Sequence, residues 1–233
     1  MELLRGQLEL ARGTAARQFG PLLSDVLKRD LDFAGSLCLL LLATPIGILI
    51  ALLVAMDGGP VFYRHCRVGR NGQLFRCLKF RTMVMDAEEC LSEYLRLHPE
   101  SVNEWQGEQK LTRDPRVTGI GSMLRKLSLD ELPQLWNVLV GEMSLVGPRP
   151  VTEGELREKY GSQANLVTSI KPGLTGLWQI SGRNDTVYQQ RVAMDVSYVR
   201  SRTLLLDLLI LLRTHDGYSL VPAPVDLANI ATS

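Results

Sequence analysis

The stretch FAGSLCLLLLATPIGILIALLVAM (33–56) decides how this chain is organised, because none of its 24 residues is charged. Charged residues stand immediately outside it, at Asp32 and Asp57. As a helix the stretch would be about 36 Å long, which is enough to cross a hydrocarbon core of roughly 30 Å. It begins too late and is too long for a cleaved signal peptide. We therefore predict a membrane helix.

Thr44-Pro45 lies at the midpoint of this helix. Pro45 has no N–H to donate to the carbonyl of Leu41, and its ring crowds that group, so a kink is expected. Each half would be about 18 Å long and would reach only the middle of the bilayer. The helix is then either a kinked spanning helix or a re-entrant one that returns to the face it entered.

Basic residues on both flanks favour the re-entrant interpretation. They are, upstream, Arg5, Arg12, Arg17, Lys28 and Arg29 and, downstream, Arg64, Arg67, Arg70, Arg76, Lys79 and Arg81. Because positive charge is retained on the cytoplasmic side, neither flank is favoured as the external one. A re-entrant helix leaves both flanks in the cytoplasm.

The composition excludes several classes of protein. Of the 233 residues, 45% are hydrophobic, which is too many for a disordered chain, and the net charge of +1 argues against nucleic-acid binding. The four cysteines form no C-x-x-C pair and the three histidines are scattered, so neither a disulfide framework nor a zinc site is indicated. The chain is expected to face the cytosol.

Outside the membrane stretch, the pattern predicts a mainly helical α/β body. Two β-prone runs, 60–69 and 73–80, flank Arg70-Asn71-Gly72, and Asn-Gly between such runs indicates a hairpin. The arginines of this hairpin suit a phosphate or a lipid headgroup, although a plain solvated face is the alternative. We expect helices over 84–98 and 187–200, a polar loop over 103–114, and a short apolar core or interfacial helix over 204–212.

An adjacent pair of carboxylates, Asp130 and Glu131, is the first candidate for chemistry. Ser128-x-x-Glu131 also fits a capping box, which would make both acids ordinary first-turn residues. Pro133 fits poorly as the fifth helical residue after such a box. The spacing alone leaves both interpretations open.

A second candidate is Arg149, which stands between Pro148 and Pro150. The two prolines restrict the backbone, so a guanidinium held there suits bidentate phosphate recognition. Lys79 and Arg81 add two cations at the exit of the hairpin. An acidic pair with several such cations is what Mg²⁺-assisted phosphoryl transfer requires, with one carboxylate on the metal and the other attacking phosphorus. The sequence has no Walker A or G-x-G-x-x-G motif.

Four ordered motifs resemble the bacterial sugar transferases, the monotopic polyprenyl-phosphate phosphoglycosyl transferases. The motifs are Lys79-Phe-Arg-Thr-Met83, Ser128-Leu-Asp-Glu-Leu-Pro-Gln-Leu-Trp-Asn137, Met143-Ser-Leu-Val-Gly-Pro-Arg-Pro150 and Pro172-Gly-Leu-Thr-Gly-Leu-Trp-Gln179. The resemblance runs from about Lys28 to Tyr218. It implies transfer of a sugar 1-phosphate from a UDP-sugar to undecaprenyl phosphate, with release of UMP and with Mg²⁺ required.

The resemblance also assigns residues. Asp130 matches the nucleophile that forms a covalent phosphosugar intermediate in a ping-pong cycle, and Glu131 matches the metal-associated acid. Arg125 and Arg149 match phosphate-contacting arginines, to which the residue pattern adds Lys79 and Arg81 as phosphate or substrate ligands. The membrane motif is represented by Lys28, Arg29, Asp32, Thr44 and Pro45, and this match strengthens the re-entrant interpretation.

The resemblance sets our expectation for domains and location. We predict an amphipathic or linker segment over 1–27, a re-entrant membrane helix over 28–57, a cytoplasmic catalytic domain over 58–220 and a tail over 221–233. The protein would lie in the bacterial inner membrane with its catalytic domain facing the cytoplasm. The four spanning helices that precede this region in many longer relatives are not in the sequence, so it is either a minimal enzyme or the catalytic domain of a longer one.

The expected function is the first membrane step of exopolysaccharide, O-antigen or capsule assembly. Segment 181–184 and the chain beyond it resemble hexose-type members of the family. The expected partners are the UDP-sugar, undecaprenyl phosphate, membrane lipid and, through the C-terminal helices, a second copy; no nucleic acid is expected. Two alternatives are a glycosyltransferase that releases UDP and a non-enzymatic membrane scaffold. The first lacks its usual Asp-x-Asp spacing, and the second leaves the acid pair without a role.

Overall fold

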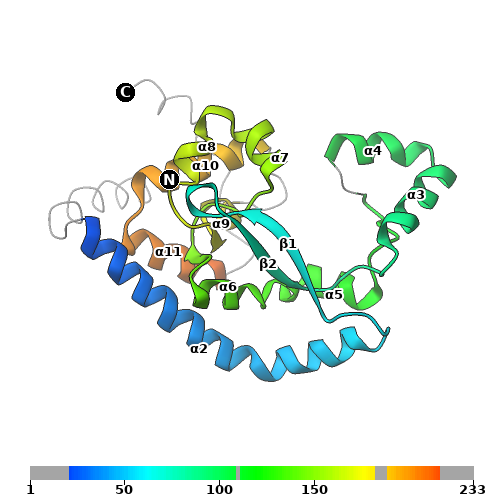
Figure 1. The fold of residues 1–233 in the computed structure, drawn as a ribbon, viewed down its shortest axis with the longest axis horizontal. Helices are drawn as coiled ribbons and strands as arrows, with labels where there is room; N and C mark the ends of the chain where they lie inside the picture. Colours follow the sequence, from blue (N-terminus) through cyan, green and yellow to red (C-terminus); the bar gives the residue numbers. More distant parts are fainter. Residues whose placement is uncertain (1–20, 109–110, 182–187, 216–233) are drawn as a thin grey trace. The chain divides into compact units, whose positions relative to one another are not determined.

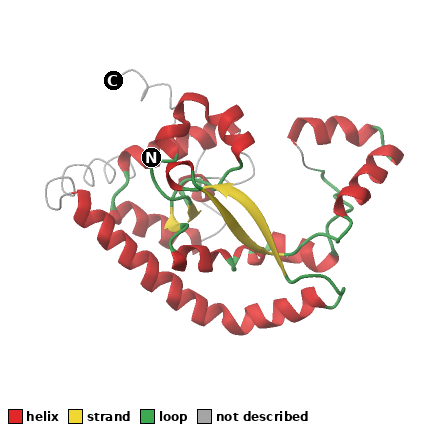
Figure 2. Ribbon diagram, viewed as in Figure 1, coloured by secondary structure: helices red, strands yellow, loops and turns green. Residues whose placement is uncertain are grey.

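The computed structural model describes residues 21–108, 111–181 and 188–215. Most of these residues are helical, and the strands form two small sheets of two strands each (Figure 2). The predicted mainly helical α/β class is therefore confirmed. Most of the expected N-terminal segment, residues 1–20, and the tail 221–233 lie outside the described residues.

Helix α2, Pro21–Ala55, contains every residue of the apolar stretch 33–56 except the last, Met56 (Figure 1). Its part from Asp25 to Ala55 is long and apolar enough to cross a membrane, and only 11% of its most apolar window is buried inside the protein. Pro45 lies inside the helix. A long apolar helix that the protein does not cover is what lipid contact requires. The re-entrant path stays a prediction.

The predicted hairpin is confirmed. Strands β1, Phe62–Val68, and β2, Leu74–Phe80, pair with each other and are joined by a turn at Arg70–Gly72. Asn71 and Gly72 both have positive φ, at 56° and 78°. Asparagine and glycine adopt this left-handed conformation at little cost, and this is why the pair ends one strand and starts the next.

The chain forms two compact units. The first unit comprises residues 1–40, 65–77 and 134–233, and the second comprises 41–64 and 78–133. The chain passes from one to the other inside α2, inside both strands of the hairpin and between residues 133 and 134. Each unit has its own buried residues and is described separately.

The second unit contains α3 (Ala87–Leu97), α4 (Glu100–Glu108), α5 (Gly119–Lys126) and the 3₁₀ turn η2 (Leu129–Glu131). Its core is formed by Ile50, Val54, Phe80 and Leu124. A Cβ on Gly121 would lie 2.1 Å from the carbonyl oxygen of Thr82, so only glycine lets α5 approach the chain after β2 this closely. The expected polar loop over 103–114 is wrong in its first part, because α4 occupies it.

The first unit contains a sheet of two short strands. Strand β3, Ser144–Val146, pairs in parallel with β4, Gly173–Thr175. The other elements are α6 (Gln134–Val140), α7 (Glu153–Glu155), η3 (Leu156–Tyr160), η4 (Gly161–Gln163), α8 (Ala164–Val167), α9 (Leu177–Ile180), α10 (Tyr188–Ser201) and α11 (Leu204–His215).

Helix α11 contains the short apolar stretch and has two different faces. Leu206 and Ile210 are buried, whereas Leu205, Leu208 and Leu212 are exposed. The sequence left a core helix and an interfacial helix as alternatives. The buried face supports the first, and the exposed leucines leave the second open.

Candidate active site

Asp130 lies in the short η2 turn of the second unit and is only 7% exposed. Ser128, the residue before the turn, has left-handed backbone angles of φ 56° and ψ 21°, and its side chain does not cap the turn. The capping-box interpretation is therefore wrong, because a capping serine needs an extended backbone. The two acids are thus not explained as ordinary first-turn residues.

Lys79, near the end of β2, is placed against both carboxylates. Its Nζ lies 2.7 Å from Oε1 of Glu131 and 3.7 Å from Oδ2 of Asp130. The hairpin exit and the η2 turn, 51 positions apart in sequence at Lys79 and Asp130, thus meet as the residue pattern suggested. One ammonium group thus lies within ion-pair distance of both carboxylates.

Burial raises the pKa of Asp130, and the neighbouring Glu131 charge raises it further. Lys79 and Arg125 act in the opposite direction because their positive charges favour the ionised carboxylate. A poorly solvated carboxylate held beside cations is suited to nucleophilic attack on an anionic substrate.

Arg125, in the last turn of α5, is fixed by the hydroxyl of Thr82, which accepts a hydrogen bond from its Nε at 2.8 Å. It is close enough to Asp130 to influence the pKa of that carboxyl. Of the predicted site residues, the structure therefore brings Asp130, Glu131, Lys79 and Arg125 together.

Arg81 has a different environment. It is 8% exposed and donates to the backbone oxygens of Val54 and Pro60, at 2.9 and 2.7 Å, and to the carboxylate of Asp57. These contacts fasten the C-terminal end of α2 to the chain after β2. Phosphate binding by Arg81 stays a prediction, and the structure shows a tie to the membrane helix.

Arg149 belongs to the first unit and is held by its backbone. Its N–H donates to the carboxyl of Asp195, which also accepts a hydrogen bond from the hydroxyl of Tyr160 at 2.7 Å. Asp195 is 1% exposed, and burial raises its pKa to about 7. The guanidinium of Arg149 lies over the ring of Trp178, 5.1 Å from its centroid.

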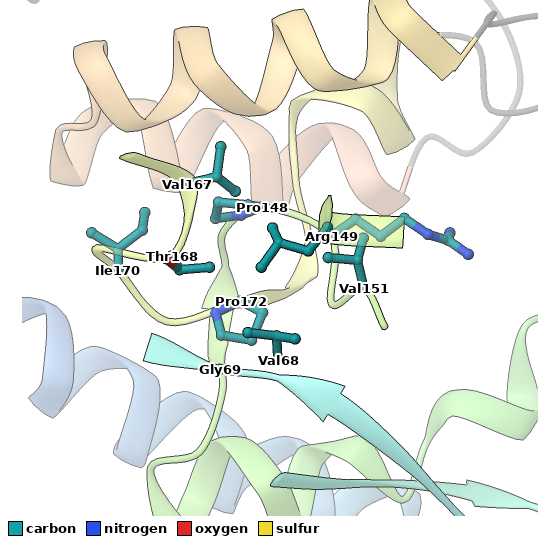
Figure 3. Close-up of a pocket in the computed structure, with 10 residues that line it drawn as sticks. Val68, Gly69, Pro148, Arg149, Val151, Val167, Thr168, Ile170 and Pro172 are labelled. Carbon is teal, nitrogen blue, oxygen red and sulfur yellow. The ribbon is translucent and has the colours of Figure 1, made fainter. Parts of the chain in front are cut away.

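A small pocket beside Arg149 is not a substrate site. It is lined mainly by apolar side chains such as Val68, Val151 and Ile170, and its volume of about 10 Å³ holds at most one water molecule. Figure 3 shows the side chain of Arg149 extending away from this pocket. The functional end of Arg149 is therefore directed elsewhere.

The motif at the start of α2 fastens the membrane helix to the first unit. Lys28 pairs with Asp207 at 2.6 Å, and Arg29 donates to the backbone oxygens of Val138 and Leu139 at the end of α6. Asp32 accepts from the N–H of Leu145 at 2.9 Å and from the hydroxyl of Ser144. The resemblance assigned Lys28, Arg29 and Asp32 to membrane placement, and the structure shows them holding β3 and α6.

The sequence analysis missed residues of this network and of the cluster around Trp178. Tyr198 donates to Asp207 at 2.6 Å, and Arg191 lies over the ring of Trp178 at 5.2 Å. One signal was visible in the sequence: Asp207 is the one charged residue of the aliphatic stretch 204–212, and a charge at such a place is buried only with a partner. Nothing in the sequence pointed to Arg191.

Asp130 and Glu131 can contribute to a magnesium site, but they cannot complete one by themselves. Among the described residues, no group of three or more His, Cys, Asp or Glu side chains is arranged to hold a metal ion. Mg²⁺ commonly binds through one or two carboxylates together with substrate phosphates, and Asp130 and Glu131 supply two. The donor set therefore fits Mg²⁺ bound with a phosphorylated substrate.

Comparison with known proteins adds an independent finding. The profile of the family described as "Bacterial sugar transferase" matches residues 23–219. The chain is 54% identical over 188 residues to "Exopolysaccharide production protein ExoY" of Rhizobium meliloti (strain 1021), a match covering 80% of this chain and 83% of that protein.

Two longer relatives are also similar. The match with "Undecaprenyl-phosphate galactose phosphotransferase" of Salmonella typhimurium is 50% identical and covers 82% of this chain but 40% of the relative. The match with "UDP-glucose:undecaprenyl-phosphate glucose-1-phosphate transferase" of Escherichia coli (strain K12) is 37% identical and covers 81% and 39%. This chain thus spans about two fifths of the length of these two relatives.

Proposed function

This chain belongs to the bacterial sugar transferase family, and from that premise we propose that it transfers a hexose 1-phosphate from a UDP-sugar to undecaprenyl phosphate and releases UMP. The names of two relatives contain this acceptor and a galactose or glucose phosphotransfer. The observation that carries the proposal is the buried Asp130, with Glu131 beside it and Lys79 bridging the two.

In the proposed reaction, a carboxylate oxygen of Asp130 attacks the phosphorus that carries the sugar. The bond from that phosphorus to the bridging oxygen breaks, and UMP leaves with the bridging oxygen. A phosphate oxygen of undecaprenyl phosphate then attacks the same phosphorus and displaces the carboxylate. Asp130 is regenerated, and the product is a lipid-linked diphosphate sugar.

Residues of both units have definable roles in this scheme. Lys79 and Arg125 stabilise the ionised form of Asp130 and offset the charge of the approaching diphosphate. Glu131, together with Asp130, would hold Mg²⁺, which when bound supplies further positive charge to the phosphates. Arg149, fixed between two prolines, is suited to bind a phosphate oxygen pair.

The proposal includes the placement in the membrane. Helix α2 would enter the bacterial inner membrane and return at Pro45, so that both of its ends and the catalytic domain face the cytoplasm. Single cysteines at Ser24 and Gly58, in a chain without its native cysteines, should both resist a membrane-impermeant thiol reagent in intact spheroplasts and react after lysis. Labelling of one of them in intact cells would contradict the re-entrant path.

A homodimer is part of the same proposal. Leu205, Leu208 and Leu212 form an exposed stripe at helical spacing on α11, and a second copy would cover it. Light scattering of the nanodisc-embedded protein should then give twice the chain mass, and Leu208→Gln should reduce it. An unchanged mass in that variant would place the dimer surface elsewhere.

The experiment that tests the reaction measures UMP and UDP separately. The purified protein in nanodiscs would be given Mg²⁺, undecaprenyl phosphate and a panel of UDP-sugars. UMP from one donor would support the proposal and identify the hexose. UDP as the product would show that the sugar–oxygen bond is broken instead. Neither product, from a folded protein and a full donor panel, would favour a scaffold in polysaccharide assembly.

A further inference from the structure

Two arginines of the first unit share one aromatic ring. The guanidinium carbons of Arg149 and Arg191 lie 5.1 and 5.2 Å from the centroid of Trp178. Arg149 comes from the turn after β3, Trp178 from α9 and Arg191 from α10, so the tertiary fold brings them together. Two like charges held on one ring repel each other unless an anion lies between or beside them.

The carboxylates that interact electrostatically with Arg149 are engaged elsewhere. Glu155 pairs with Arg67 at 2.8 Å, and Asp195 accepts from the hydroxyl of Tyr160 and from the backbone N–H of Arg149. These two carboxylates therefore use partners other than the guanidinium group of Arg149. Within the described part of the chain, neither Arg149 nor Arg191 forms an ion pair with a carboxylate, so their charge can be met by a bound anion.

Several buried polar atoms on α9 and α10 also lack hydrogen-bond partners. Within the described part of the chain, these atoms are Nε1 of Trp178, Oε1 of Gln179, the hydroxyl of Tyr188 and Nε of Arg191. Trp178 itself is 8% exposed. Buried polar atoms are normally satisfied in folded proteins, so the two unpartnered donors at the contact of Trp178 with Arg191, Nε1 and Nε, point to a bound ligand.

The chemistry of the donor groups at Trp178 indicates the class of ligand. Arg149, Arg191 and the N–H of Trp178 are all donors, and the two guanidinium groups carry positive charge. A phosphate offers several acceptor oxygens and negative charge, which matches donors that converge from three elements. A sugar or a base alone would leave the two charges without a counter-ion.

We propose that Arg149, Arg191 and the Nε1–H of Trp178 form one phosphate-binding subsite, and that Arg191 and Trp178 are further substrate-binding residues of this enzyme. The proposal rests on the function proposed above, in which two substrates carry phosphate. The diphosphate of the UDP-sugar and the phosphate of undecaprenyl phosphate have the same chemistry at this subsite. The test therefore has one arm for each source.

The first arm measures binding without turnover. Calorimetry of the full chain in nanodiscs would compare UDP with uridine for the wild type, Arg191→Gln and Trp178→Phe; the phenylalanine keeps the ring and removes the N–H. Lys159→Gln is the matched control, because Lys159 lies over Tyr188 and not over Trp178. We expect UDP affinity to fall about tenfold or more in Arg191→Gln and severalfold in Trp178→Phe. Uridine affinity and the control should not change.

The second arm measures undecaprenyl phosphate. If Arg191→Gln raises KM for this lipid and leaves UDP affinity unchanged, the subsite holds the acceptor phosphate. If neither UDP affinity nor that KM changes, the proposal is wrong. An equal loss of uridine affinity would also overturn it, because the residue would then act on the nucleoside. Arg191→Lys, which keeps the charge, should recover part of the lost affinity.

The two proposals fail in distinguishable ways. If the wild type binds UDP through Arg191 but releases no UMP from any donor, the phosphate subsite stands and the transfer reaction does not. If UMP is released and Arg191→Gln binds both phosphorylated ligands normally, the reaction stands and the subsite does not. Melting temperatures of each variant show whether a loss of binding is a loss of folding.

Discussion

Asp130 and Asp195 are both buried and burial raises the pKa of both, yet their surroundings differ in kind. Asp130 has charged neighbours, with Lys79 at 3.7 Å and Glu131 next in the chain. Asp195 has donors that belong to the fold, the hydroxyl of Tyr160 at 2.7 Å and a backbone N–H. The first carboxylate has neighbours that a charged substrate can rearrange, whereas the second is fully engaged.

This difference teaches that a raised pKa does not by itself mark a catalytic carboxylate. Burial disfavours the charged form wherever it occurs, so structural and reactive aspartates share the shift. The partners separate them. Asp207 lies between the two cases, because it accepts from Lys28 as well as from Tyr198, both at 2.6 Å.

The largest expected effect comes from replacing Asp130, the reactive carboxylate of the two. Asp130→Asn removes the nucleophile, so turnover should fall by at least about 10³-fold, as for other nucleophile deletions. UMP release measures it, and intact-mass spectrometry should find a phosphosugar adduct on the wild type but not on the variant. Asp86→Asn, an exposed aspartate of the same unit, is the control. Normal turnover in Asp130→Asn would refute the nucleophile assignment.

The next effect concerns Asp207. Lys28→Met leaves this buried carboxylate without its cation, and the free energy of unfolding should fall by about 3 kcal/mol. Thermal melting in detergent measures the loss. The double variant with Asp207→Asn should recover much of it, because the unpaired charge is gone. Arg202→Gln, which breaks the more exposed pair with Asp25, should cost about 1 kcal/mol or less. Equal losses would show that the Lys28 pair is no more important than a surface pair.

A smaller effect tests what Lys79 does for Asp130. Lys79 favours the ionised carboxylate, so Lys79→Gln should raise the pKa of Asp130 further. Activity at acidic pH should then fall by about tenfold more than at alkaline pH, and the acidic limb of the kcat/KM profile should move to higher pH. Lys126→Gln, an exposed neighbour, should leave the limb in place. A loss of equal size at every pH would contradict this explanation.

The last effect concerns Asp195 and appears only as a dependence of stability on pH. Its pKa is raised from 3.8 to about 7, so the wild type loses stability as pH rises through this window, because the folded state must ionise a buried group. Asp195→Asn does not ionise and keeps an oxygen for Tyr160. It should match the wild type near pH 4 and be more stable at pH 8, by up to about 4 kcal/mol for a shift of this size, as measured by melting. A stability difference independent of pH would show that Asp195 does not titrate in this way.

Features that rest on neighbours in the chain were predictable from the sequence. Of the 24 uncharged residues of 33–56, all but the last lie in one helix, and Asn71-Gly72 turns the chain between two strands. Periodicity and turn chemistry act over a few residues, so a sequence displays them. The adjacent acids and the proline-bracketed Arg149 were visible for the same reason.

Only the tertiary structure decided which partners each charged side chain has. Ser128 has a left-handed backbone, which rules out the capping box that the sequence permitted. Arg81 binds the end of α2 instead of standing free. Arg149 and Arg191 come from different elements and both lie over the ring of Trp178, and no local sequence pattern encodes these contacts. An ionisable side chain acquires its pKa and its role from groups distant in the chain, since burial and charge act through space and not along the sequence.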